Sequence, residues 1–211
     1  VTRLLPPRVL PRLDFSAGVP EDYVTMVVVP CLVSGRDEID FLLHQLELHY
    51  LSDDDPRLHF ALPTDFADAP QEHMAEDEEL LERVRAGIRA LNRKYPRRAS
   101  DPFYLFHRHR QWNPSENSWM GWERKRGKLE EFNRLLAGAE DTSYSVKLGD
   151  TSILSKVRYV ITLDADTVIS RNTARRLIGT LAHPLNQPLF ASDSREVVAG
   201  YTVLQPRTEV K

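Results

Sequence analysis

The sequence predicts an α/β fold with a mostly parallel, Rossmann-like sheet and helices on both of its faces. Three observations predict it. Short apolar segments rich in β-branched and aromatic residues alternate with longer amphipathic segments. The apolar segments are nearly continuous, as is typical of strands buried on both faces. Polar residues follow several of these segments, and ligands of such sheets bind beyond the carboxyl ends of the strands.

The first 20 residues are expected to form an extended arm or a linker, and residues 21–211 are expected to form one domain. Prolines prevent a continuous helix in the arm, because each fixes the backbone and lacks an N–H donor. These prolines are Pro6, Pro7, Pro11 and Pro20.

The first half of the domain begins with an apolar, β-branched run over Thr25–Pro30, which predicts a buried strand. Gly35–Leu51 carries apolar residues at helical spacing and predicts a helix. Leu58–Leu62 is a second apolar run and predicts a second strand. Glu76–Tyr95 is charged on one side and apolar on the other, so it predicts a long helix that Pro96 ends.

The second half continues the alternation. Phe103–Phe106 predicts a strand, and a Trp- and Asn-rich loop then leads into a helix over about Gly121–Ala137. Val157–Leu163 is the strongest strand signal of the chain. Ser170–Ala182 predicts a short helix with Ser170 as its N-cap, and Val197–Leu204 predicts a last strand.

Composition excludes several classes of protein. The 211 residues hold 28 Lys and Arg against 31 Asp and Glu, a net charge of -3, which gives no support for a nucleic-acid binder driven by charge. The single cysteine, Cys31, excludes an internal disulfide framework and a cysteine-built zinc site. No apolar run approaches the ~20 residues of a membrane-spanning helix, and we expect no signal peptide. Because the chain starts at Val1, we expect a piece of a longer protein.

The sharpest chemical signal is the pair Asp164 and Asp166, directly after the strand Val157–Leu163. In extended backbone, residues i and i+2 point the same way, so the two carboxylates would converge. Two such charges repel unless a cation lies between them, and oxygen ligands suit Mg²⁺ or Mn²⁺. A solvated loop, or Asp166 capping the next turn, is the alternative interpretation.

Two lysines follow at the start of the helix Gly121–Ala137. The expected apolar stripe consists of Trp122, Leu129, Phe132, Leu135 and Leu136. Helical geometry places Lys125 within about 40° of Leu129, inside that stripe, and Lys128 toward the polar side. A cation near a helix N-terminus is disfavoured by the helix dipole, so Lys125 is expected to have an anionic partner, such as a diphosphate. Alternatively, Lys125 extends into water, and Lys128 is expected to belong to a solvated basic face.

Three further features are open to both a functional and a structural interpretation. Asp65 ends the second strand and is able to accept hydrogen bonds from a nucleobase or a ribose, or to bond its own turn. The tryptophans of the loop Gln111–Met120 are able to stack on sugars but are more typical of packing anchors. The run His107–Arg110 alternates along a strand end, so its members are not expected to form one site. Cys31 is expected to be an inert buried thiol.

Together these residues resemble the A-type nucleotide-sugar glycosyltransferases, and more narrowly the glucosyltransferase domain of bacterial cyclic β-1,2-glucan synthases. The resemblance covers most of Val24–Arg207. Its elements are Val29-Pro30, Thr64–Asp68, Lys125–Leu129, Tyr159–Asp166 and Gly200–Pro206.

The resemblance implies a partial GT-A domain, truncated at its C-terminus, which binds UDP-glucose and serves inverting transfer to a β-1,2-glucan. It implies that Asp164 and Asp166 hold Mg²⁺ or Mn²⁺ against the donor diphosphate, that Lys125 faces the same diphosphate and that Asp65 contacts uracil. The implied donor-binding residues are Pro30, Asp65, Lys125, Lys128 and Asp164. It also implies a parent protein at the cytoplasmic face of the bacterial inner membrane.

One component of that chemistry has no match in the chain. Inverting transfer needs a general base for the acceptor hydroxyl, and the resemblance places it beyond Lys211, because Asp193, Glu196 and Glu209 lack its context. We therefore expect an isolated piece that binds the donor without completing transfer.

Two other functions fit parts of the sequence. In a haloacid-dehalogenase-like phosphatase, Asp164 would attack phosphorus and Asp166 would act as general acid, although that motif normally opens its fold. In a non-catalytic interaction module, the aspartates would merely be exposed, and the helix Glu76–Tyr95 would be a docking face.

Overall fold

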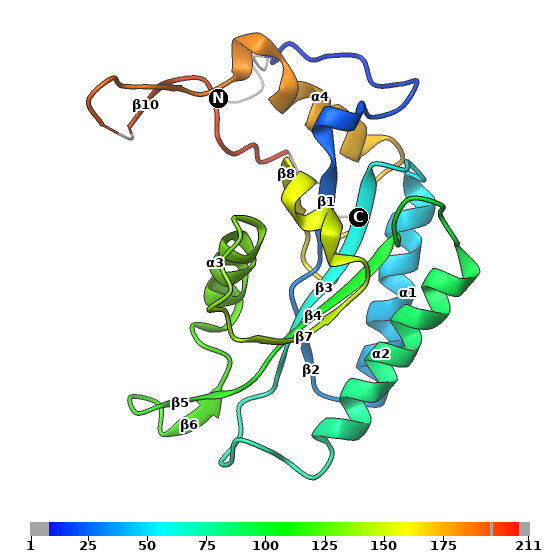
Figure 1. The fold of residues 1–211 in the computed structure, drawn as a ribbon, viewed down its shortest axis with the longest axis vertical. Helices are drawn as coiled ribbons and strands as arrows, with labels where there is room; N and C mark the ends of the chain where they lie inside the picture. Colours follow the sequence, from blue (N-terminus) through cyan, green and yellow to red (C-terminus); the bar gives the residue numbers. More distant parts are fainter. Residues whose placement is uncertain (1–8, 195, 207–211) are drawn as a thin grey trace, which may run out of the picture.

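The computed structural model describes residues 9–194 and 196–206, and shows a mixed α/β fold built on a mostly parallel sheet (Figure 1). The strand order is β7-β4-β3-β1-β8, and β2 pairs with β3 in line with β1. Neighbours are parallel except for β4 and β7. The strands are β1 Thr25–Val28, β2 Cys31–Val33, β3 Leu58–Phe66, β4 Phe103–Arg108, β7 Tyr144–Leu148 and β8 Tyr159–Thr162. The predicted fold class is confirmed.

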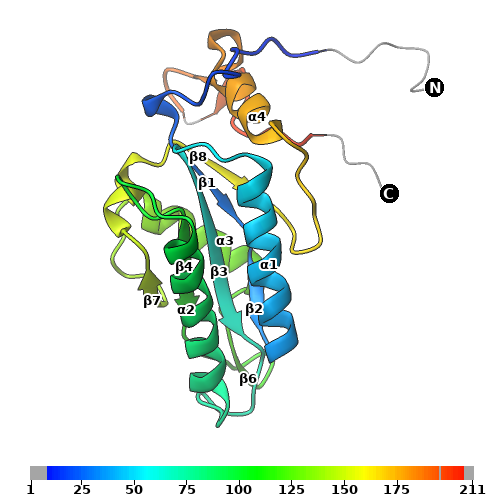
Figure 2. The ribbon, with the colours of Figure 1, turned by 90° about the vertical axis from the view of Figure 1, so that its right-hand side faces the viewer.

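Helices cover both faces of this sheet, as Figure 2 shows for α1 and α2 in front of the sheet and α3 behind it. The helices are α1 Arg36–Ser52, α2 Asp77–Lys94, α3 Arg124–Leu136 and α4 Thr173–Ala182. Alternate strand residues point to opposite faces of the sheet and belong to two apolar clusters. Phe60, Leu62 and Leu105 pack with α1, α2 and α4, whereas Ala61 and Phe106 pack with α3.

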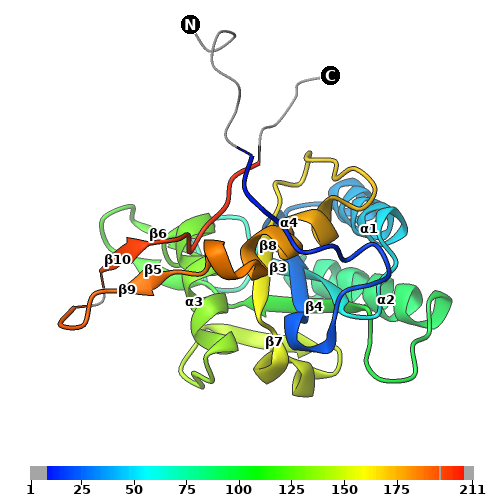
Figure 3. The ribbon, with the colours of Figure 1, turned by 90° about the horizontal axis from the view of Figure 1, so that it is seen from above.

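Residues 9–20 of the expected arm lie along α4 (Figure 3). The amide of Leu13 donates to the carbonyl of Gly179 at 2.9 Å, and Phe15 and Val19 are buried. A Cβ on Gly179 would lie 2.4 Å from the Leu13 carbonyl oxygen, so this close approach requires glycine. Residues 1–8, like Arg207, Glu209 and Lys211, lie outside the described residues.

Several expected strand bounds were wrong. The first strand divides into β1 and β2 at Val29-Pro30, because Pro30 has no N–H for the ladder. The second strand continues to Phe66, and β7 was not predicted. β8 ends at Thr162 and is only half-buried, because it lies at an edge of the described sheet.

The last expected elements also differ from the structure. α4 starts at Thr173 after Asn172, whose φ is 61°, so Ser170 is not its N-cap. The last strand shortens to β10, Val197–Ala199, which pairs with β9, Leu189–Phe190, in a separate small sheet. Two further strands, β5 Gln111–Asn113 and β6 Ser118–Met120, form a hairpin within the predicted Trp-rich loop. Short 3-10 helices occur at Glu21–Tyr23, Thr151–Lys156 and Pro184–Asn186.

Two buried histidines predict an acid-sensitive fold. Burial lowers the pKa of His59, on β3, to about 4, and burial lowers the pKa of His107, on β4, to about 4. The unfolded chain therefore binds more protons between pH 6.5 and pH 4, so stability is lost as the pH falls through this range. We expect a loss of about 1–2 kcal/mol per histidine between pH 7 and pH 5, measured by urea denaturation.

The double variant His59→Asn, His107→Asn removes both titrations while keeping a donor near each ring position, and should flatten the profile. The variant His73→Asn removes an exposed imidazole and serves as the control. Identical pH profiles for the native protein and the double variant would contradict the assignment.

Candidate donor-binding site

Two polar clusters join α3 to the carboxyl ends of β3 and β4 and to the turn after β8. One is exposed and consists of Lys125 and Asp164, which form an ion pair. The other is buried and consists of Asp65, Arg108, Lys128 and Glu131. The first contains the predicted diphosphate contact, Lys125, and one of the two predicted metal ligands, Asp164.

The exposed pair joins the start of α3 to the turn after β8. The Lys125 side chain is 54% exposed and that of Asp164 is 60% exposed. The amide of Thr167 donates to the carbonyl of Asp164 at 2.9 Å, which closes a turn over residues 164–167. The expectation that Asp166 follows in extended backbone was therefore wrong, although both aspartates are exposed.

The described residues contain no group of three or more His, Cys, Asp or Glu side chains able to hold a metal ion. Any ion bound by Asp164 and Asp166 would therefore complete its shell with water and ligand oxygens, as Mg²⁺ commonly does. Two exposed carboxylates fit such an ion by their chemistry. The metal site remains a prediction.

The two lysines of α3 have exchanged the environments that the sequence predicted. Lys128 is 2% exposed, whereas Lys125 reaches the surface. The expectation was wrong because Leu129, from which the stripe was placed, is only half-buried, and the buried face of α3 is centred on Lys128 and Phe132 instead. That face consists of Gly127, Lys128, Glu131, Phe132 and Leu135.

Lys128 links two other predicted donor-binding residues below the surface: it contacts Asp65 directly and reaches the backbone beside Pro30. Its ammonium lies 3.2 Å from Asp65 Oδ2 and donates to the carbonyl of Cys31, next to the buried Pro30. Burial lowers the pKa of Lys128, and the charge of Asp65 opposes this. Burial also raises the pKa of the Cys31 thiol to about 12, so the expected inert thiol is consistent with its surroundings.

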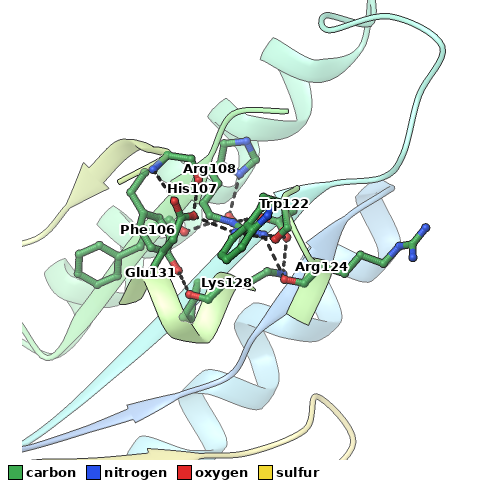
Figure 4. A network of polar contacts seen from close by, with 12 residues as sticks. Phe106, His107, Arg108, Trp122, Arg124, Lys128 and Glu131 are labelled. Atoms are coloured by element: carbon green, nitrogen blue, oxygen red, sulfur yellow. Dashed lines mark hydrogen bonds and ion pairs between the residues drawn. The ribbon is translucent and has the colours of Figure 1, made fainter. Parts of the chain in front are cut away.

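Arg108 is the centre of the buried cluster (Figure 4). Its guanidinium is fully buried and binds Asp65 through two hydrogen bonds, Nε to Oδ1 at 2.6 Å and Nη2 to Oδ2 at 2.8 Å. Nη1 donates to Glu131 Oε2 at 2.9 Å. Glu131 also accepts hydrogen bonds from the amide and hydroxyl of Ser143. Two cations and two anions are thus buried together, which offsets much of their desolvation cost.

The same contacts hold Arg108 and Glu131 in their charged forms. Burial opposes the charge of Arg108, but the hydrogen bonds and charge of Asp65 outweigh it and raise the pKa of Arg108. Burial would raise the pKa of Glu131, but hydrogen bonds from Ser143 and Arg108 outweigh it and lower that pKa. Arg108 and Glu131 are therefore both held in their charged forms.

Arg108 also fixes the segment that leads into α3. It donates to the carbonyl of Trp122 from Nη1 and to the carbonyl of Arg124 from Nη2, each at 3.1 Å. Glu123 and Arg124 have φ values of 50° and 46°, a left-handed conformation that non-glycine residues rarely adopt. The buried guanidinium thus stabilises the turn that presents Lys125.

Two glycines allow this segment to approach the cluster. A Cβ on Gly121 would lie 2.5 Å from the carboxylate of Asp65, and one on Gly127 would lie 2.1 Å from the Trp122 carbonyl oxygen. Neither position has room for a side chain, so both glycines are required by close packing.

The sequence analysis missed Arg108 and Glu131. The run His107–Arg110 was treated as a set of unrelated residues, yet Arg108 and Arg110 are both buried in ion pairs, with Asp65 and Asp77 respectively. The parallel register that pairs Thr64 with His107 also brings Asp65 beside Arg108, a signal that strand pairing would have supplied. Both Asp65 oxygens face cations of the chain itself, and its contact with uracil remains a prediction.

Comparison with known proteins identifies a relative of this chain. The chain is 44% identical over 194 residues, 92% of its length, to the cyclic beta-(1,2)-glucan synthase NdvB of Rhizobium meliloti (strain 1021). This chain is similar to one segment of that synthase. The match spans 7% of the relative's length. No model of a protein family matches the chain. The resemblance predicted from the sequence is confirmed.

Within the described ranges, no helix combines the length and the apolar character needed to cross a membrane.

Replacing Arg108 should test the role of the buried cluster. Arg108→Met leaves Glu131 without its guanidinium partner and Asp65 with Lys128 alone, so we expect the free energy of unfolding to fall by about 3–5 kcal/mol. Urea denaturation measures it. Arg134→Met breaks an exposed pair with Asp141 and should cost less than about 1 kcal/mol. If Arg108→Met does not fold, Arg108→Lys, which keeps the charge but loses the bidentate geometry, gives the measurement. Equal losses for the Arg108 and Arg134 variants would contradict this role.

Proposed function

We propose that this chain forms the donor-binding part of an inverting glycosyltransferase that transfers glucose from UDP-glucose to a β-1,2-linked glucan. The observation that carries the proposal is the exposed pair of Lys125 and Asp164 at the carboxyl ends of the parallel strands, where α/β sheets bind their ligands. The 44% identity to a segment of a cyclic beta-(1,2)-glucan synthase supports the sugar chemistry.

The exposed pair is suited to exchange partners. An ion pair between solvated side chains contributes only about 0–1 kcal/mol, so a ligand is able to separate it at small cost. A nucleoside diphosphate with a divalent cation carries both charges needed: the diphosphate for Lys125, and the cation for Asp164 and Asp166. The ion pair therefore keeps the two groups beside each other in the free protein.

Asp164 and Asp166 would hold Mg²⁺ or Mn²⁺, and such an ion would offset the charge of the diphosphate leaving group. Lys125 would hold the same diphosphate from the α3 side. Lys128, Asp65 and the backbone at Pro30 would shape the floor of the site, because Lys128 joins Asp65 to the carbonyl of Cys31. We assign the general base for the acceptor hydroxyl to no residue of this chain.

The proposal extends to the longer protein. A synthase that consumes UDP-glucose needs the cytoplasmic pool of that donor, so we propose that the parent presents this site at the cytoplasmic face of the bacterial inner membrane. The glucan acceptor would then be supplied by other parts of the parent.

Calorimetric titration with UDP tests the site. We expect Mn²⁺ to tighten UDP binding by about tenfold, equivalent to about 1.4 kcal/mol. Asp164→Asn and Asp166→Asn should each abolish this metal dependence, because each removes an anionic ligand. Lys125→Gln should weaken UDP binding with and without the metal.

The matched control is Asp141→Asn, which breaks the exposed ion pair with Arg134 far from Asp164 in the sequence and should leave binding unchanged. Equal UDP affinity with and without Mn²⁺ would overturn the metal role of the aspartates. Phosphate release from an aryl phosphate, lost in Asp164→Asn, would instead establish the phosphatase. Absence of any effect of UDP or metal on the melting temperature would favour an interaction module.

A further inference from the structure

A cavity of about 490 Å³ lies between the β5–β6 hairpin and the segment that leads into α3. Figure 1 shows this hairpin at the lower left, below α3. Ligand sites of proteins typically have volumes of about 300–1,000 Å³. The cavity is lined by Gln111, Trp112, Asn113, Pro114, Ser115, Glu116, Met120, Trp122, Glu123 and Arg124.

Two tryptophans in this lining are unusually exposed. Trp112 is 44% exposed and Trp122 is 39% exposed. The sequence analysis favoured packing anchors for the loop tryptophans, and only Trp119 has strong backbone anchoring: its amide and carbonyl both bond Ala69 at 2.9 Å. Large exposed aromatic surface in a concave site is more typical of ligand contact than of packing.

The polar groups of the lining suit a ligand with many hydroxyls. Glu116 and Arg124 form an exposed ion pair, and Gln111 offers an exposed amide on the same lining. A carboxylate accepts hydrogen bonds, a guanidinium donates them, and an amide does both, so together they match hydroxyls in either role.

The cavity is built on a fixed frame. Asn113 Oδ1 accepts hydrogen bonds from the amides of Ser115 and Glu116, which holds the hairpin turn. Arg124 forms a second ion pair with Asp68, and its carbonyl accepts a hydrogen bond from the buried Arg108. A site whose lining is held in place before binding loses less entropy when the ligand arrives.

The cavity adjoins the proposed donor site through consecutive residues. Trp122, Glu123 and Arg124 line the cavity, and the next residue, Lys125, pairs with Asp164. We propose that the hairpin cavity is a carbohydrate subsite in which Trp112 and Trp122 contact sugar faces of a gluco-oligosaccharide. The identity of the sugar as glucose rests on the proposed function, whereas the carbohydrate class rests on the lining.

Nuclear magnetic resonance of the three indole N–H groups tests the proposal. Titration with a linear β-1,2-linked gluco-oligosaccharide should shift the signals of Trp112 and Trp122 in a saturable manner and leave Trp119 less affected. Trp112→Ala should weaken binding by about tenfold, equivalent to about 1.4 kcal/mol, because it removes the aromatic face that contacts the sugar.

Phe41→Ala removes an exposed aromatic side chain from α1 and serves as the control, with binding unchanged. If Trp112→Ala fails to fold, Gln111→Ala and Glu116→Gln, which alter only exposed polar groups, should weaken binding instead. Saturable shifts with a proline-rich peptide and none with the oligosaccharide would overturn the subsite, as would unchanged affinity in all three cavity variants.

A parallel UDP titration separates the two proposals. Oligosaccharide binding without UDP binding would support the subsite and remove the donor site. UDP binding without oligosaccharide binding would overturn the subsite and leave the donor site in place.

Discussion

The buried guanidinium of Arg108 is the constraint on which the geometry of the site depends. It lies at the carboxyl end of β4, binds Asp65 on β3 and Glu131 on α3, and donates hydrogen bonds to the carbonyls of Trp122 and Arg124. Buried charge is costly unless every charge has a partner and good geometry. Here the two carboxylates, the guanidinium and the ammonium of Lys128 meet that condition, so the sheet and α3 are held in one arrangement.

That rigidity has a functional consequence at the surface. The left-handed backbone at Glu123 and Arg124 is strained and persists because Arg108 holds the surrounding carbonyls. It sets where α3 starts and therefore where Lys125 points. The deep cluster is strongly bonded and the shallow Lys125–Asp164 pair is weakly held, since its members are more than half exposed. A rigid buried cluster beneath an exposed ion pair that separates easily is suited to a charged ligand that binds reversibly.

Much of the fold could be predicted from the sequence because the signals were local. The apolar runs of β1, β3 and β4 and the periodicity of α1 and α2 were sufficient to predict the order of elements. β7 and the hairpins could not be predicted in this way, because short strands depend on their partners. The break at Pro30 could have been predicted, because proline has no N–H to donate to a neighbouring strand.

The site was predicted less completely, and the two lysines of α3 show why. The apolar stripe was placed from Trp122 and Leu129, but Trp122 is exposed and precedes the helix, and Leu129 is only half-buried. The buried face instead includes Lys128, because Asp65 and the carbonyl of Cys31, both distant in sequence, supply its partners.

Asp65 also shows that the environment of a site residue depends on partners that are distant in sequence. A carboxylate at the end of a strand is equally compatible with a ligand and with an internal ion pair, and only the parallel register of β3 and β4 shows that Arg108 lies beside it. Because both its oxygens are bonded to chain cations, a nucleobase that approaches Asp65 would meet a charge-balanced group rather than a free acceptor.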